Sequence, residues 1–255
     1  MHAEQVLVML AAATSAGWVD AVVGGGGLIQ LPALLLVNPG QPVATALATN
    51  KLGSIAGTTS AAIAYARKAK PDVRIAGPAA ALAVCCAAGG ALCAAAISSD
   101  VLKPVIMVVL LAVAALVVLK PDLGRAPRLV LRTRRRIALA IVVPGVAIAF
   151  YDGLVGPGTG TFLVIAFTTL LGLDFVDASA TSKIINAGTN LGALVVFAAQ
   201  GHVLWAIGLG MAVCNAVGAQ LGARMAISLG AGFVRIVLLC VVAALVLKMG
   251  YEQFA

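Results

Sequence analysis

The chain has 255 residues, of which 62% are hydrophobic and only 10% are charged, and its formal net charge is +8. Soluble globular domains carry about 25% charged residues, and so few charges could not cover a water-facing surface, which argues against a soluble fold. The composition predicts an all-α polytopic membrane protein, in which the positive charge marks cytoplasmic loops rather than a nucleic-acid partner.

Five apolar segments precede residue 120. A membrane span needs about 20 residues, so the long segments are expected to cross the bilayer. The short one, 28–37, is predicted to be a re-entrant or broken helix. The five segments are 5–23, 28–37, 42–66, 75–97 and 101–119. Together they form the first transmembrane repeat, residues 1–119.

A basic cytoplasmic linker at 120–136 is followed by a second transmembrane repeat, residues 137–255, in which the same pattern returns. The segment 161–173 is again short, and its longer neighbours are 137–155, 175–199, 203–227 and 233–249. Each half holds five segments, an odd number, so the two halves are predicted to have opposite orientation. Such inverted-topology repeats are typical of secondary transporters.

A constant offset in the numbering supports the duplication. Asp152 minus Asp20 gives 132. The same offset relates Gly24 to Gly156, Gly26 to Gly158, Thr49 to Thr181 and Lys51 to Lys183. An ungapped register that matches Asp, Gly, Thr and Lys is hard to obtain by chance, so we infer that the repeat is real.

Lysine and arginine residues gather at two places. Four of the 17 lie between Arg67 and Arg74, and seven lie in the linker 120–136. Both clusters are predicted to be cytoplasmic, because short cytoplasmic loops are rich in Lys and Arg. Counting spans from these clusters places the turn at 98–100 and both ends of the chain outside.

Each half has a glycine-rich break after its first segment, and breaks at corresponding positions of two repeats point to a transport site. Unwound backbone at membrane depth must line a cavity or be buried in protein, and a helix that restarts there aims free N–H groups at an anion. Alternatively, the glycines serve close packing of helices. The residues whose backbone is predicted to bind the anion are Gly24, Gly25, Gly26, Gly27, Gly156, Gly158, Thr159 and Gly160.

A lysine also lies inside a long apolar segment of each half, at Lys51 and Lys183. Buried ammonium groups are costly unless paired, so these lysines are candidates to supply charge to a substrate. Asn186 and Asn190 follow Lys183 at helical spacing and are expected on the same side. The neighbouring side chains that add short polar groups are Thr49, Asn50, Thr181 and Ser182.

Two aspartates precede the breaks, and two roles are open for them. Asp20 and Asp152 could carry a coupling proton. Alternatively, each could pair with the lysine of its own half as a structural lock, Asp20 with Lys51 and Asp152 with Lys183.

At these residues the chain resembles the TauE/SafE family of sulfite-exporter-type permeases, within the 4-toluene sulfonate uptake permease superfamily. The motifs that carry the resemblance are GWVDAVVGGGG, LATNKLGS, FYDGLVGPGTG and ATSKIINAGTN. The resemblance implies a multi-pass protein of the bacterial inner membrane that carries sulfite, organosulfonates or related sulfur-containing or carboxylate anions. Ser182 stands where the first copy has Asn50, so the two halves of the site need not be equivalent.

The sequence therefore predicts a secondary transporter of small anions that works by alternating access, with a passive anion channel as the alternative. An enzyme is not expected, since the chain has neither an HExxH nor a GxSxG motif. No cofactor is expected, and the five cysteines show no metal-ligand spacing. The expected partners are the small anion and the lipid bilayer, and a coupling proton or cation and a homo-oligomeric state are left open.

Overall fold

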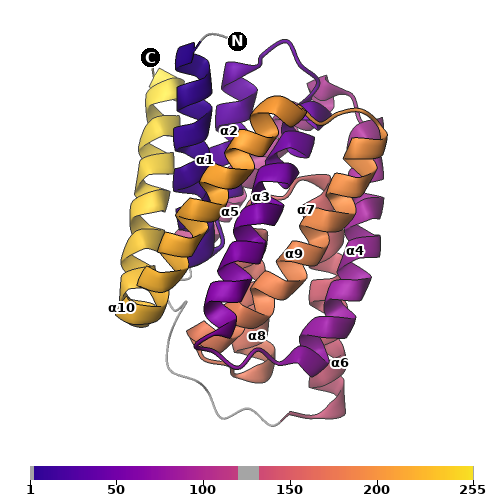
Figure 1. Cartoon of the computed structure of the whole chain (residues 1–255), viewed down its shortest axis with the longest axis vertical. Helices are drawn as coiled ribbons and strands as arrows, with labels where there is room; N and C mark the ends of the chain where they lie inside the picture. Colours follow the sequence, from indigo (N-terminus) through magenta and orange to yellow (C-terminus); the bar gives the residue numbers. More distant parts are fainter. Residues whose placement is uncertain (1–2, 120–131, 255) are drawn as a thin grey trace.

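The structure is a computed structural model that describes residues 3–119 and 132–254, and every regular element in these two ranges is a helix. The helices of the first half are α1 (Ala3–Val23), α2 (Gly27–Val37), α3 (Val43–Ala66), α4 (Val73–Ala96) and α5 (Ser99–Leu119). Those of the second half are α6 (Arg134–Val142), the π-helix η1 (Val143–Ile148), α7 (Ala149–Leu154), α8 (Thr159–Leu171), α9 (Phe175–Ala199) and α10 (Trp205–Phe254). Figure 1 shows their arrangement.

The helices follow the predicted apolar segments closely, with two departures in the second half. The last two predicted segments form one helical run, α10, which is interrupted at Gly230 (φ 71°, ψ −169°). The segment predicted at 137–155 contains the π-helix η1 with Pro144 near its start. Proline has no N–H to donate and therefore disturbs the regular hydrogen bonding of an α-helix.

Five helical stretches in the described residues are long and apolar enough to cross a membrane. They are Ala3–Val23, Val73–Ala96, Arg134–Leu154, Phe175–Ala199 and Trp205–Gly230. Large apolar side chains such as Leu111, Val195 and Val213 are exposed on the outer faces of the helices, as expected where the surroundings are lipid. The chain therefore has the helix content of a multi-pass membrane protein.

The two short helices lie toward opposite ends of the molecule. α2 has 11 residues and α8 has 13, so at about 1.5 Å per residue each is shorter than a hydrocarbon core of about 30 Å. In Figure 1, α2 lies toward the end that holds the N-terminus, whereas α8 lies toward the other end. Each short helix follows a glycine-rich break in the chain.

The turn between α3 and α4 and the start of α6 lie at the end opposite the N-terminus (Figure 1). Arg132, just before α6, forms an ion pair of 2.9 Å with Asp72 in the turn between α3 and α4. The other end is tied by a hydrogen bond of 3.1 Å from the Val43 N–H to the Ser99 hydroxyl. Of the predicted basic linker 120–136, residues 120–131 lie outside the described residues.

The centre of the bundle is formed by α3 and α9, which contact each other and lie side by side in Figure 1. α1 packs against α10, and α7 packs against α4. Glycines allow these helices to approach closely, because a Cβ at Gly222 would meet the Trp18 carbonyl and a Cβ at Gly90 would meet the Phe150 carbonyl. This packing places the two glycine-rich breaks beside α3 and α9.

Candidate functional site

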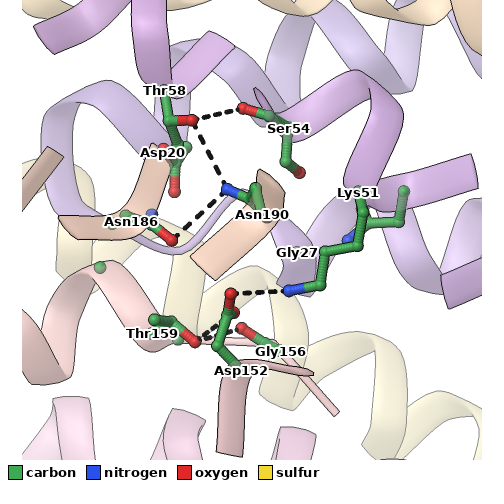
Figure 2. A pocket seen from close by; sticks show the side chains of 14 residues that line it. Asp20, Gly27, Lys51, Ser54, Thr58, Asp152, Gly156, Thr159, Asn186 and Asn190 are labelled. Atoms are coloured by element: carbon green, nitrogen blue, oxygen red, sulfur yellow. Dashed lines mark hydrogen bonds and ion pairs between the residues drawn. The ribbon is translucent and has the colours of Figure 1, made fainter. Parts of the chain in front are cut away.

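A pocket with about 290 Å³ of space between atoms lies where the two breaks meet α3 and α9. Its walls come equally from the two halves of the chain. They are formed by Asp20, Gly24, Gly27, Asn50, Lys51, Ser54 and Thr58 from the first half and by Asp152, Gly156, Gly158, Thr159, Gly160, Asn186 and Asn190 from the second. Figure 2 shows the pocket from close by.

The two breaks pack against each other, backbone to backbone. Gly24 has a positive φ of 83°, and a Cβ at this position would collide with the backbone of Gly160 and Thr161. Only glycine meets both conditions without strain. The Thr161 hydroxyl donates a hydrogen bond of 2.7 Å to the Val23 carbonyl at the end of α1. Each break is therefore held in place by the other half of the chain.

Lys51 reaches from α3 to the second break. Its Nζ lies 2.7 Å from Asp152 Oδ2, and the two side chains are only 2% and 3% exposed. A Cβ at Gly156, whose φ is +94°, would lie 3.2 Å from this Nζ, so the ammonium sits directly on the break. The pairing of Lys51 and Asp152 is visible in Figure 2.

Lys183 reaches from α9 to the first break in the same way. Its Nζ lies 2.7 Å from Asp20 Oδ2 and also donates to the Asp20 carbonyl. The hypothesis that each lysine pairs with the aspartate of its own half is therefore wrong, because both pairs are crossed. A sequence register matches positions within the two copies, but it does not say which copy a side chain contacts.

The two carboxylates have different surroundings. The Thr159 hydroxyl lies 2.6 Å from Asp152 Oδ1 and 2.7 Å from the Gly156 carbonyl, and can donate to either. The position that corresponds to Thr159 in the first half is Gly27, which has no hydroxyl. The Asp20 side chain is 16% exposed, compared with 3% for Asp152. Asp152 thus has one more polar side chain beside it and is shielded more completely, although its Oδ2 meets Lys51 as an ion pair without a hydrogen bond.

Several predicted site residues do not line the pocket, and Lys183 is one of them, because it reaches the wall only through Asp20. The Thr49 hydroxyl donates to the Thr45 carbonyl and accepts from the N–H of Leu204, which precedes α10. The Thr181 hydroxyl likewise donates within α9, and it accepts from the N–H of Asp72, which precedes α4. Both threonines therefore fasten the starts of other helices.

Of the remaining predicted residues, some line the pocket and others pack behind its walls. A Cβ at Gly26 would meet the Ala16 carbonyl at 2.6 Å, so this glycine serves the packing of α2 on α1. Gly25 contacts Leu28 and is absent from the walls. Ser182 is fully buried, and its hydroxyl has no hydrogen-bond partner in the described part of the chain. Asn50 does line the pocket, and its buried Oδ1 also lacks a hydrogen-bond partner there.

Two wall residues, Ser54 and Thr58, were missed by the sequence reasoning. They follow Asn50 at intervals of four residues, and they correspond to Asn186 and Asn190 under the offset of 132. Residues four apart share one face of a helix, so α3 and α9 each present a polar row to the pocket. Asn190 Nδ2 joins the rows, at 3.5 Å from both the Thr58 hydroxyl and Asn186 Oδ1, as Figure 2 shows.

The pocket suits a small polar ligand better than a metal ion. Among the described residues, no group of three or more His, Cys, Asp or Glu side chains could hold a metal. The pocket instead offers the ammonium of Lys51, amides, hydroxyls and the backbone at the start of α8, with the ammonium of Lys183 behind Asp20. The amide of Asn50 can donate or accept a hydrogen bond, depending on its orientation. These groups together can bind an oxyanion, provided that an ammonium is released from its carboxylate.

Comparison with known proteins identifies the family of the chain. The sequence profile of the family described as "Sulfite exporter TauE/SafE" matches residues 9–249. The chain is 38% identical to the probable membrane transporter protein ORF9 of a Sinorhizobium species, over 94% of this chain and 90% of that protein. It is 34% identical to the probable membrane transporter protein YfcA of Escherichia coli, over 96% of this chain and 90% of that protein. No solved structure matches the chain significantly.

Proposed function

The chain belongs to the TauE/SafE family of membrane transporters, and from this premise we propose that it carries a small anion through the central pocket as a secondary transporter. The observation that carries this proposal is that the buried Lys51 and two helix breaks meet in one pocket, with the buried Lys183 paired to the wall residue Asp20. The substrate class is sulfite, an organosulfonate or a related small sulfur-containing or carboxylate anion.

The positive end of a helix contributes to anion binding. α8 begins at Thr159, directly after Gly158, and both residues line the pocket together with Gly160. The first N–H groups of a helix have no partner within the helix and carry a partial positive charge. An anion held there also meets the ammonium of Lys51 on the neighbouring break. Because both lysines are paired, the anion competes with a carboxylate for its ammonium.

An inverted repeat is supported by contacts between the halves that occur in pairs related by the offset of 132. If 132 is added to the residue number of the first-half partner and subtracted from that of the second-half partner, one contact of each pair becomes the other contact. The paired contacts are Lys51–Asp152 with Lys183–Asp20, Thr49–Leu204 with Thr181–Asp72, and Gly90–Phe150 with Gly222–Trp18. These contacts support a two-fold relation between the halves, and because the corresponding short helices α2 and α8 lie toward opposite ends (Figure 1), we interpret 1–119 and 137–255 as two halves of opposite orientation.

Alternating access follows from this relation. If the halves are equivalent but inverted, a conformation open to one side of the membrane has a counterpart open to the other. The pocket lies at the junction of the halves, so a movement of one half against the other changes which side it faces. Transport then saturates with substrate, whereas a channel would show passive, non-saturating flux.

Substitution of the lysines tests the proposal in proteoliposomes. We expect Lys51→Ala and Lys183→Ala to reduce uptake of radiolabelled sulfite or methanesulfonate by at least about tenfold, because each removes a positive charge, in the pocket wall or paired to it, worth more than about 1.4 kcal/mol of binding. Lys103→Ala is the matched control, since Lys103 is exposed on α5 and outside the pocket. Its uptake should equal that of the unmodified protein.

The double variant Lys51→Ala with Asp152→Asn guards against loss of folding, because it leaves no unpaired charge. It should remain monodisperse and still fail to transport. Unchanged uptake in well-folded lysine variants would refute the role of the lysines. Anion currents that do not saturate would instead establish the channel.

A further inference from the structure

The carboxylates of the two ion pairs differ in how much they are exposed and in which side chains they contact. Asp152 contacts the ammonium of Lys51 and the hydroxyl of Thr159, and its side chain is 3% exposed. The Asp20 carboxylate contacts the ammonium of Lys183 and is 16% exposed. A proton can therefore reach Asp20 more readily than Asp152.

The charges of the pocket cancel while both pairs are closed, since two ammonium groups face two carboxylates. An added anion leaves one negative charge in excess, and an uncompensated buried charge is strongly unfavourable. A proton bound to one carboxylate restores the balance and releases one ammonium at the same time. The electrostatics of the pocket thus favour the arrival of an anion together with a proton.

The helices near Asp20 carry few other charged or titratable groups. Among the described side chains they are Asp177 and Lys183 of α9, Lys51 and Tyr65 of α3, Tyr151 and Asp152 of α7, and Cys214, Arg224 and Cys240 of α10, whereas α2 and α8 carry none. Tyr65 donates its hydroxyl to the Ala21 carbonyl, and Arg224 is exposed. Lys183 is therefore the group that responds directly to a change of charge on Asp20.

We propose that Asp20 is the proton-binding residue that couples anion transport to protons. A proton adds to one carboxylate oxygen of Asp20, the ion pair with Lys183 opens, and the anion takes the place of the carboxylate beside the ammonium. Asp152 keeps its pair with Lys51 throughout. One proton is bound for each anion bound, and both leave together on the other side. This inference rests on the proposed function, and it names the coupling ion and its site.

Binding and proton movement are measured with methanesulfonate, whose own charge does not change between about pH 5 and pH 8. Because the anion-bound state holds one more proton, its affinity should rise as the pH falls, by up to about tenfold per pH unit. In pyranine-loaded proteoliposomes, uptake of the anion should acidify the lumen, and an inward proton gradient should drive accumulation. The proton measurement uses the unmodified protein, so it does not depend on how a variant folds.

Asp20→Asn imitates the protonated residue, because the amide is neutral and similar in shape. We expect this variant to bind methanesulfonate with an affinity that no longer depends on pH, and to lose accumulation driven by the proton gradient. Asp100→Asn is the control, since Asp100 is outside the pocket at the start of α5. It should retain both the pH dependence and the accumulation.

The outcomes separate the two proposals. If the unmodified protein moves methanesulfonate or sulfite without moving protons, or if Asp20→Asn keeps the pH dependence, the role of Asp20 is refuted and the proposed function stands. If the unmodified protein moves neither anion, the proposed function fails and the coupling inference fails with it. Both proposals are supported if Asp20→Asn loses the pH dependence of methanesulfonate binding while Asp100→Asn keeps it.

Discussion

The crossed pairing of Lys51 with Asp152 can be tested through stability, independently of transport. Asp152→Asn leaves the Lys51 ammonium, which is 2% exposed, without a counter-charge. Removing one partner of a buried ion pair costs about 3–5 kcal/mol. For a chain of this size, Tm changes by about 2–4 °C per kcal/mol, so we expect a decrease of about 6–20 °C.

The matching double variant should recover most of this loss. Lys51→Met with Asp152→Asn removes both charges, and replacing a whole buried pair by neutral groups is often close to neutral in stability. Lys51→Met with Asp20→Asn is the control, because it breaks both crossed pairs and leaves Asp152 and Lys183 unpaired. The effects of its two single substitutions should add without any recovery.

Thermal unfolding of purified protein in detergent, at fixed pH and salt, measures all five variants, the three single ones and the two double ones. The monodisperse fraction after heating is read by size-exclusion chromatography. A positive coupling for Lys51 with Asp152, and none for Lys51 with Asp20, confirms the crossed arrangement. The reverse result, recovery only when Lys51 and Asp20 are changed together, would refute it and restore pairing within each half.

Two further predictions concern the breaks and the polar residues beside the lysines. Gly24→Ala should abolish the monodisperse protein, because alanine disfavours the φ of +83° and its Cβ would collide with the facing backbone. Gly40→Ala is the control, because nothing lies within 4 Å of a Cβ at this position, and it should behave as the unmodified protein. Thr49→Val and Thr181→Val should each lower stability by about 1–3 kcal/mol, since each leaves a backbone N–H without its acceptor. Anion affinity measured in the same two variants should stay within about twofold, well under 1.4 kcal/mol, and a larger change would mean that these threonines contact the substrate.

Helical geometry explains which polar residues beside the lysines could have been predicted correctly. Thr49 and Lys51 are two residues apart, and residues two apart do not share a face of a helix. Asn50, Ser54 and Thr58 are separated by four residues and do share one. The spacing therefore favours the row that begins at Asn50, which lines the pocket, over Thr49, which does not. The Thr-Asn-Lys motif by itself does not distinguish its three members.

Other features depend on tertiary contacts and could not be obtained from the sequence. The apolar runs give the helix boundaries well, because membrane spans impose a length and a hydropathy. The offset of 132 identifies Lys51 and Lys183 as equivalent, but the choice between Asp20 and Asp152 as partner depends on how the halves dock. The π-helix η1 has Pro144 as its one local signal, and a proline can equally well kink a helix or end it.

The crossing of the pairs has a consequence that pairing within each half would not have. Lys183 belongs to the second half and Asp20 to the first. Their ion pair therefore links the two halves, and it also holds the ammonium that the anion would bind. In the proposed mechanism, the proton that releases Lys183 to the anion also removes one of the two charged links that join the halves at the pocket. The Lys51–Asp152 link remains and keeps the halves in register. Binding of the substrate and freedom of the halves to move are thereby coupled through one carboxylate, which is what alternating access with a proton requires.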